Sequence, residues 1–134
     1  MIRGSCLCGG VRFEYGRSRG GVGMCHCSQC RKVSGVASNA VIVVPAAELR
    51  WLAGEELHKT FAKPSGWHTT FCSVCGCPVP QLLPTGDAYW VPAGALDDDP
   101  GPRIAGHIYV GSRASWDEIA GDAPRFEAGL PARK

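Results

Sequence analysis

The chain has 134 residues and a formal net charge of +2 at pH 7, and it contains eight cysteines. This length predicts one domain, residues 1–134, and the small charge excludes the basic footprint of a nucleic-acid-binding protein. No apolar run approaches the ~20 residues of a membrane helix, and the N-terminus has no apolar signal sequence. We therefore expect a cytoplasmic protein without nucleic-acid or membrane partners. The sequence does not indicate an oligomeric state.

The 18 glycines and 10 prolines favour short strands joined by turns, and thus an all-β fold. Residues 11–15, "VRFEY", alternate apolar and charged side chains and predict a strand with one buried face. Residues 38–44, "SNAVIVV", form a β-branched run typical of a buried strand. Residues 45–49, "PAAEL", open with proline and predict one helical turn.

The second half of the chain continues this pattern. Residues 56–62 and 67–71 flank the turn signal "KPSG" and predict a hairpin that ends at a cysteine. Residues 87–96 contain Pro92 and predict an edge or irregular strand. Ser115 and Glu118 have the spacing of a capping box, so we expect a short C-terminal helix over residues 115–119. The last residues, 128–134, are expected to fray.

The eight cysteines are clustered along the chain. They form a C-x-C pair, a C-x-C-x-x-C trio and a C-x-x-C pair followed by one more cysteine, at positions Cys6, Cys8, Cys25, Cys27, Cys30, Cys72, Cys75 and Cys77. A disulfide framework is disfavoured because we expect a reducing compartment. A thioredoxin-like redox pair is disfavoured because "CGCPVP" does not begin a helix.

Zinc binding fits the spacing better. Two thiolates on one zinc ion lie roughly 3.8 Å apart, and both a C-x-C strand end and a C-x-x-C turn bring two sulfurs that close. We therefore pair Cys6 and Cys8 with Cys72 and Cys75 as one closed site, named here the four-cysteine group. Four thiolates leave no open position, so this site is predicted to be structural.

Cys25, Cys27 and Cys30, the three-cysteine group, remain. Three protein ligands and one open position are the arrangement of a catalytic zinc, which can hold and deprotonate an external thiol. Such a thiolate is a nucleophile suited to a carbonyl carbon. The alternative is that Cys77 or His26 closes this site too, although His26 alternates with two cysteines and would point away from the metal.

Five segments together resemble the glutathione-dependent formaldehyde-activating enzyme family. They are "GSCLCGGVRFE", "MCHCSQCRKVSG", "TFCSVCGCPVP", "VPAGALDDDP" and "HIYVGSRASWDEI". The resemblance runs over residues 4–126. It implies an all-β "tent" of small antiparallel sheets stapled by two zinc ions, with the four-cysteine group structural and the three-cysteine group catalytic. Cys77 departs from the family pattern.

The resemblance also implies a carbon–sulfur lyase that joins glutathione and formaldehyde to give S-hydroxymethylglutathione, or splits that adduct. The expected partners are therefore a small thiol such as glutathione and a small aldehyde. The alternative is a non-enzymatic, zinc-stapled binding module whose three-cysteine site is vestigial.

Other residues are candidates for substrate contacts. Arg31 and Lys32 follow the trio and could meet a carboxylate of glutathione, or Arg31 an oxyanion. Asp97 and His107 match family motifs but are more often hydrogen-bonding residues. The aromatic side chains that could line a pocket are Trp67, Trp90, Tyr109 and Trp116.

Overall fold

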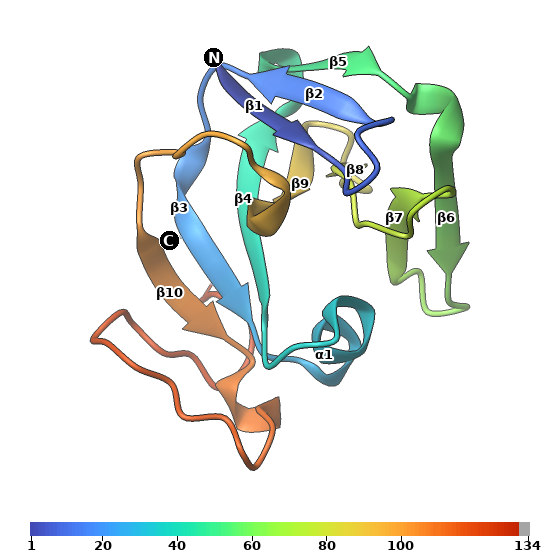
Figure 1. The fold of residues 1–134 in the computed structure, drawn as a ribbon. Helices are drawn as coiled ribbons and strands as arrows, with labels where there is room; N and C mark the ends of the chain where they lie inside the picture. Colours follow the sequence, from blue (N-terminus) through green and yellow to red (C-terminus); the bar gives the residue numbers. More distant parts are fainter. Residues whose placement is uncertain (132–134) are drawn as a thin grey trace.

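The structure is a computed structural model and describes residues 1–131. In that part of the chain, three small sheets and one short α-helix surround the centre of the molecule (Figure 1). The sheets do not close into a barrel, and the all-β prediction is confirmed. No helix among these residues is both long and apolar enough to cross a membrane.

The first sheet has the order β1-β2-β5, and both of its pairings are antiparallel. Its strands are β1 (Ile2–Ser5), β2 (Arg12–Tyr15) and β5 (Leu49–Ala53). β2 is the strand predicted for residues 11–15, and its alternating apolar side chains are buried as expected.

One charged residue of β2 departs from that alternation. Glu14 is buried although it lies on the opposite face from Phe13 and Tyr15. The Arg50 guanidinium on β5 donates a hydrogen bond to its carboxylate. The ion pair supplies the partner that a buried carboxylate needs.

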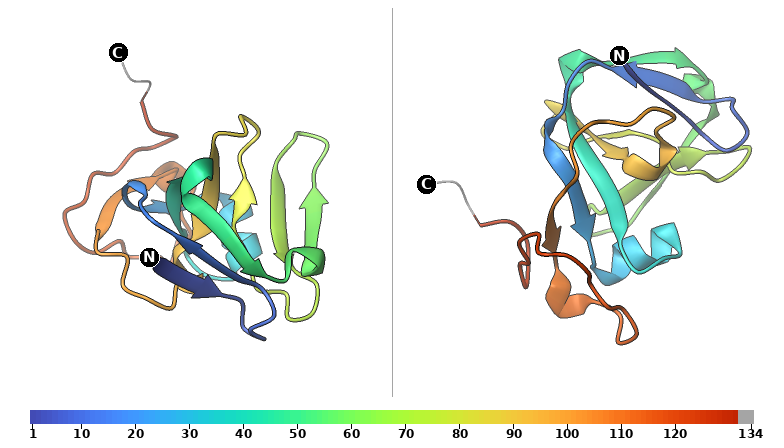
Figure 2. Two further views of the ribbon diagram at one scale, coloured as in Figure 1. Left: turned by 90° about the horizontal axis from the view of Figure 1, so that it is seen from above. Right: turned by 60° about the vertical axis from the view of Figure 1, so that its left-hand side comes forward.

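The second sheet has the order β10-β3-β4-β9-β8. Its strands are β3 (Arg19–Cys25), β4 (Asn39–Pro45), β8 (Gln81–Leu82), β9 (Ala88–Pro92) and β10 (Ile104–Ile108). β10 pairs with β3 in parallel, whereas the other pairs of this sheet are antiparallel. The parallel pair arises because a long loop returns the chain to the end of the sheet where β3 begins (Figures 1 and 2).

β9 lies inside this sheet, so of the predicted edge or irregular strand the edge alternative was wrong, whereas the strand does give way to a 3-10 turn at Ala93–Ala95. Pro92 is its last residue and lies opposite Val41 of β4. The other neighbour, β8, reaches only Tyr89 and Trp90. Proline is tolerated at position 92 because the pairing of β9 with β8 has already ended before this residue.

The third sheet is the hairpin of β6 (His58–Ala62) and β7 (His68–Cys72), as predicted. It stands to one side of the other two sheets (Figure 1). The single turn expected after residue 45 is also present, as a 3-10 turn at Ala46–Glu48.

The short C-terminal helix predicted over residues 115–119 is absent. Only one turn forms there, in which the Asp117 N–H donates to the Ala114 carbonyl at 3.0 Å. Trp116 is 69% exposed, and a helix this short needs a packed apolar face to be stable. Among the described residues, the one α-helix is α1 (Ser28–Ser34).

The segment after β10 is held by backbone hydrogen bonds. The His107 N–H donates to the Pro124 carbonyl at 2.8 Å, and the Phe126 N–H donates to the His107 carbonyl at 2.9 Å. The Tyr109 N–H also donates to the Ala128 carbonyl at 2.9 Å, so residue 128 is anchored rather than frayed. Residues 132–134 of the predicted frayed end lie outside the described part of the chain.

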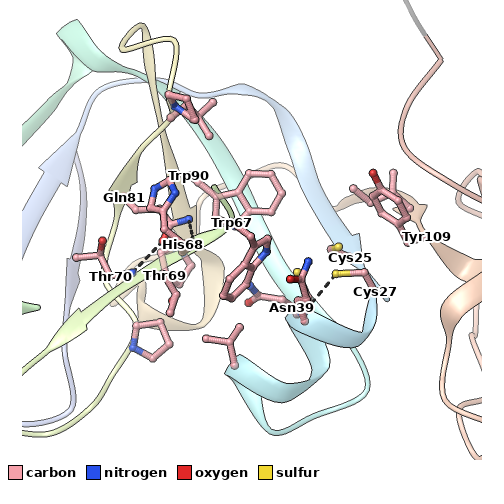
Figure 3. A pocket seen from close by; sticks show the side chains of 18 of the residues that line it. Cys25, Cys27, Asn39, Trp67, His68, Thr69, Thr70, Gln81, Trp90 and Tyr109 are labelled. Carbon is pink, nitrogen blue, oxygen red and sulfur yellow. Dashed lines mark hydrogen bonds between the residues drawn. The ribbon is translucent and has the colours of Figure 1, made fainter. Parts of the chain in front are cut away.

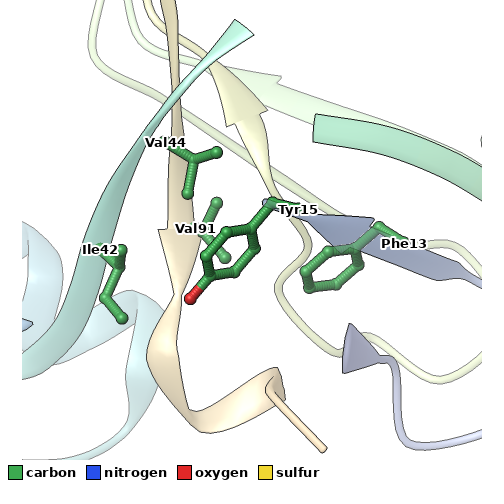
Figure 4. Packing of buried hydrophobic residues seen from close by; sticks show 5 residues of the cluster. All are labelled: Phe13, Tyr15, Ile42, Val44 and Val91. Atoms are coloured by element: carbon green, nitrogen blue, oxygen red, sulfur yellow. The ribbon is translucent and has the colours of Figure 1, made fainter. Parts of the chain in front are cut away.

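Two apolar clusters hold the sheets together. The first lies between β2 and the second sheet and contains Phe13, Tyr15, Ile42, Val44 and Val91 (Figure 4). The second surrounds part of the four-cysteine group and contains Cys6, Val11, Cys72 and Val79. The apolar core therefore continues directly into a cluster of thiols.

Gly4 tests the packing of the first cluster. A Cβ atom at Gly4 would overlap the fully buried Phe13 ring, which has no room to move. We expect Gly4→Ala to lower the free energy of unfolding by about 1–3 kcal/mol. Gly23→Ala is the matched control, since its nearest neighbour would be the Val41 carbonyl oxygen at 3.9 Å. Urea denaturation of both variants checks this, and equal stability of the two would contradict the packing described.

Candidate functional site

The four-cysteine group forms as the spacing predicts. The sulfurs of Cys6, Cys8, Cys72 and Cys75 all lie within 4.8 Å of one another. The Cys6 and Cys8 sulfurs are 3.5 Å apart, and the Cys8 and Cys72 sulfurs are 3.9 Å apart. These distances match the roughly 3.8 Å between two thiolates on one tetrahedral zinc, so the donor set fits that ion.

Two tight turns direct these sulfurs inward. The Gly9 N–H donates to the Cys6 carbonyl at 2.9 Å, and the Gly76 N–H donates to the Cys72 carbonyl at 2.8 Å. Both glycines are left-handed, with φ of 79° and 76°, where a side chain would be strained. The Val11 N–H also donates to the Cys6 sulfur at 3.2 Å, which stabilises a thiolate there.

The three-cysteine group lies where β3 turns into α1. Cys25 is the last residue of β3, Cys27 is the N-cap of α1, and Cys30 lies in its first turn. Their sulfurs are within 4.8 Å of one another, and the Cys30 N–H donates to the Cys27 sulfur at 3.3 Å. Three converging thiols fit a zinc ion with one position left for an external ligand.

Each group is prepared for a cation by its own hydrogen bonds. The Cys30 thiol donates to Cys25, which lowers the pKa of Cys25 to about 6 despite burial. A backbone hydrogen bond from Cys77 is the main cause that lowers the pKa of Cys75 to about 6. A metal ion has to displace fewer protons from a group that already holds one thiolate.

The residues weighed as a fourth ligand of the trio lie elsewhere. The Cys77 thiol donates to the Pro78 carbonyl at 3.3 Å, and burial raises the pKa of Cys77. The eight cysteines are all free, so the structure contains no disulfide framework. His26 is not part of the three-cysteine group, in agreement with its alternation with two cysteines.

His26 takes part in a buried polar chain that the sequence does not reveal. Its Nε2 lies 2.9 Å from Nδ1 of His107, and its Nδ1 lies 3.1 Å from the Asp117 carboxylate. Burial is the main cause that lowers the pKa of His107. This series of hydrogen bonds links the segment that carries the three-cysteine group to β10 and to the turn that replaces the predicted helix. The residues of the series therefore position that segment.

A pocket of about 560 Å³ adjoins the three-cysteine group. Figure 3 shows the indoles of Trp67 and Trp90 between the cysteines and the His68–Gln81 wall. Both indoles and Tyr109 line the pocket, as expected, whereas Trp116 does not. Asn39, Gly129 and Leu130 also line the pocket and come from distant segments, and no sequence pattern marked them as site residues.

The predicted substrate contacts lie outside this lining. The Arg31 guanidinium donates to the Ser112 carbonyl at 3.3 Å, and Lys32 is exposed. Asp97 is exposed and accepts a hydrogen bond from the Ser5 hydroxyl at 2.8 Å. Tyr109, in contrast, enters the pocket with a left-handed φ of 57°, which places local backbone strain beside the site.

Comparison with known proteins shows which family shares this sequence. A family model described as "Glutathione-dependent formaldehyde-activating enzyme" matches residues 1–112. The chain belongs to this family. The predicted resemblance is thereby confirmed, and the two cysteine groups agree with a zinc-binding member of it.

A solved structure shares the fold. It is the crystal structure of a Rhodobacter sphaeroides protein from a structural genomics programme, with 19% sequence identity and a TM-score of 0.62. The match covers 92% of this chain and 98% of that chain. No curated protein matches the chain.

The two groups are expected to bind two zinc ions of unequal lability, because one offers four thiolates and the other three. Elemental analysis and a chelator titration with a colorimetric zinc reporter check this. A single tightly held zinc, with the three-cysteine group freely alkylated in the metal-replete chain, would contradict the catalytic assignment.

Substitutions should separate the groups. Cys72→Ser should unfold the chain, because a structural zinc contributes on the order of 10 kcal/mol to folding. Cys27→Ser should leave a folded chain that lacks the labile zinc, and Cys77→Ser, which lies in neither group, should keep both ions. Circular dichroism and zinc content decide this; equal loss of structure in Cys72→Ser and Cys27→Ser would contradict the assignment.

Proposed function

We propose that this protein is a zinc-dependent carbon–sulfur lyase that forms and splits an adduct between a thiol and a small aldehyde. The observation that carries the proposal is the opening of the three-cysteine group onto the pocket that also holds Trp67 and Trp90. A purely structural metal site would need no such pocket. The family description names glutathione and formaldehyde, which makes them the first pair to test.

The reaction takes no atoms from the protein. A thiol sulfur adds to the aldehyde carbon, a carbon–sulfur bond forms, and the proton lost by the thiol ends on the former aldehyde oxygen. When bound at the three-cysteine group, zinc would hold the substrate sulfur and lower the pKa of its thiol. Because the nucleophilicity of a thiolate falls with its pKa, orientation by the pocket must supply the larger share of the rate.

The chain's own residues can supply that orientation. Asn39 is the cross-strand partner of Cys25, so their side chains share one face of the sheet, and both line the pocket. Figure 3 shows the Asn39 carboxamide next to the cysteines. We assign Asn39 as the donor that holds the aldehyde oxygen as negative charge develops on it.

Arg31 was the other candidate for this task. Its guanidinium donates to the Ser112 carbonyl, and Arg31 is not among the residues that line the pocket. The N–H groups of Cys30 and Arg31 are bonded to the Cys27 sulfur and the Cys27 carbonyl, so they are not free donors. Asn39 lines the pocket, so the Arg31 role stays the weaker of the two assignments.

We propose the cytoplasm as the compartment. The support is that all eight cysteines are free and that both groups need reduced thiols to bind a metal. In an oxidising compartment the closely spaced thiols of each group would compete for disulfide formation.

Two-dimensional exchange NMR on glutathione and formaldehyde tests the activity. We expect the zinc-loaded chain to accelerate interconversion with S-hydroxymethylglutathione, Cys27→Ser to abolish the acceleration, and Asn39→Ala to reduce it by about 10²-fold. Cys77→Ser is the control that should match wild type. If neither glutathione nor a panel of other thiols is accelerated, and no thiol perturbs the spectrum of a cobalt-substituted chain, the binding-module alternative replaces this proposal.

A further inference from the structure

The chemistry of the pocket limits which thiol it can receive. None of the lining residues among residues 1–131 is lysine, arginine, aspartate or glutamate. Most of the lining is apolar or aromatic and comes from Val33, Trp67, Pro78, Val79, Leu83 and Trp90, among others. Glutathione carries two carboxylates and an ammonium group, and each loses hydration when it enters such a lining.

Two polar side chains of the far wall, Gln81 and Thr70, are already hydrogen-bonded within the protein. Gln81 accepts a hydrogen bond from the Thr70 N–H at 3.0 Å and donates to the His68 carbonyl at 3.1 Å (Figure 3). The Thr70 hydroxyl lies 2.9 Å from the Thr60 hydroxyl. A carboxylate placed against Gln81 and Thr70 would therefore have to compete with these internal hydrogen bonds.

Two cations near the pocket in the described part of the chain, Lys63 and Arg31, do not line it. Lys63 is exposed at the rim, where its ammonium donates to the Gln29 side chain at 3.0 Å. An ion pair at an exposed position contributes little to binding. Arg31 is turned to the Ser112 carbonyl.

The two indoles offer what an apolar ligand needs. Trp67 and Trp90 lie between the three-cysteine group and the far wall, where a ring or branched chain attached to a metal-held sulfur would extend (Figure 3). The volume of about 560 Å³ is larger than formaldehyde and a simple alkyl thiol require. The pocket is large enough for glutathione. The selection between thiols therefore rests on the charged groups of glutathione and not on its size.

We propose that the pocket selects an uncharged thiol with an aromatic or branched apolar group, so that the preferred adduct is a hydrophobic thiol–aldehyde adduct rather than S-hydroxymethylglutathione. This inference rests on the proposed lyase function. It assigns Trp67 and Trp90 as the residues that determine specificity.

Isothermal titration calorimetry on the zinc-loaded full chain tests the inference without relying on turnover. The probes are phenylmethanethiol, glutathione and 2-mercaptoethanol, which is uncharged and too small to reach both indoles. Burial of a phenyl ring corresponds to a factor of about ten or more in affinity. We expect phenylmethanethiol to bind about tenfold or more tightly than glutathione, and exchange NMR to show faster turnover of its formaldehyde adduct.

Substitutions test whether the two indoles cause the preference for an apolar thiol. Trp67→Ala should weaken phenylmethanethiol binding about fivefold and leave 2-mercaptoethanol binding unchanged. Trp116→Ala is the matched control, since Trp116 is 69% exposed and outside the lining. The ligand comparison on the unaltered chain stands even if Trp67→Ala does not fold, and Trp90→Phe provides a second, milder change.

The outcomes separate this inference from the proposed function. Glutathione binding as tightly as phenylmethanethiol, or more tightly, would overturn the inference and leave the lyase proposal intact. Loss of that glutathione binding in Lys63→Gln would then identify Lys63 as the responsible cation. Absence of binding and exchange with every thiol would overturn both.

Discussion

The convergence of two cysteine pairs, separated by more than sixty residues, is the constraint on which the rest of the structure depends. The β6–β7 hairpin is a sheet of only two strands, and a hairpin of that size is marginal in water without further packing. Cys72 ends β7 and meets the turn that follows β1. A metal ion held by the four-cysteine group would thus restrain the hairpin in the way that a third strand does in larger sheets.

The same hairpin also builds one wall of the pocket. Trp67, Thr69 and Thr70 line the pocket, and Cys72 follows them along the same strand. Gln81 adds a second restraint, because its carboxamide bonds the backbone of residues 68 and 70 in the way that a neighbouring strand would. The distance between the three-cysteine group and the opposite wall is therefore set by the four-cysteine group.

Local patterns in the sequence predicted the parts of the molecule that depend on local chemistry. The ligand spacing of Cys25, Cys27 and Cys30 is contained in six residues, so the trio could be recognised without knowledge of the fold. The "KPSG" turn likewise predicted the β6–β7 pairing. In both cases the residues that interact are near neighbours in the chain.

Contacts over long separations could not be predicted in this way. His26 and Asp117 are 91 residues apart, and only the parallel placement of β10 beside β3 brings them together. The capping pattern at Ser115 was present, but exposed Trp116 shows that it had no apolar face to support a helix. The sequence pattern does not predict α1, because this helix has only seven residues and is capped by Cys27 rather than by serine or aspartate.

The uneven burial of the four-cysteine group has a consequence for oxidative damage. Cys6 and Cys72 are buried, whereas Cys8 is exposed. An oxidant arriving from solvent therefore meets Cys8 first, and conversion of this one sulfur to a sulfenic acid removes a ligand from the group. The hairpin wall would then lose a restraint, and the pocket would change shape although the oxidised sulfur is not part of its lining.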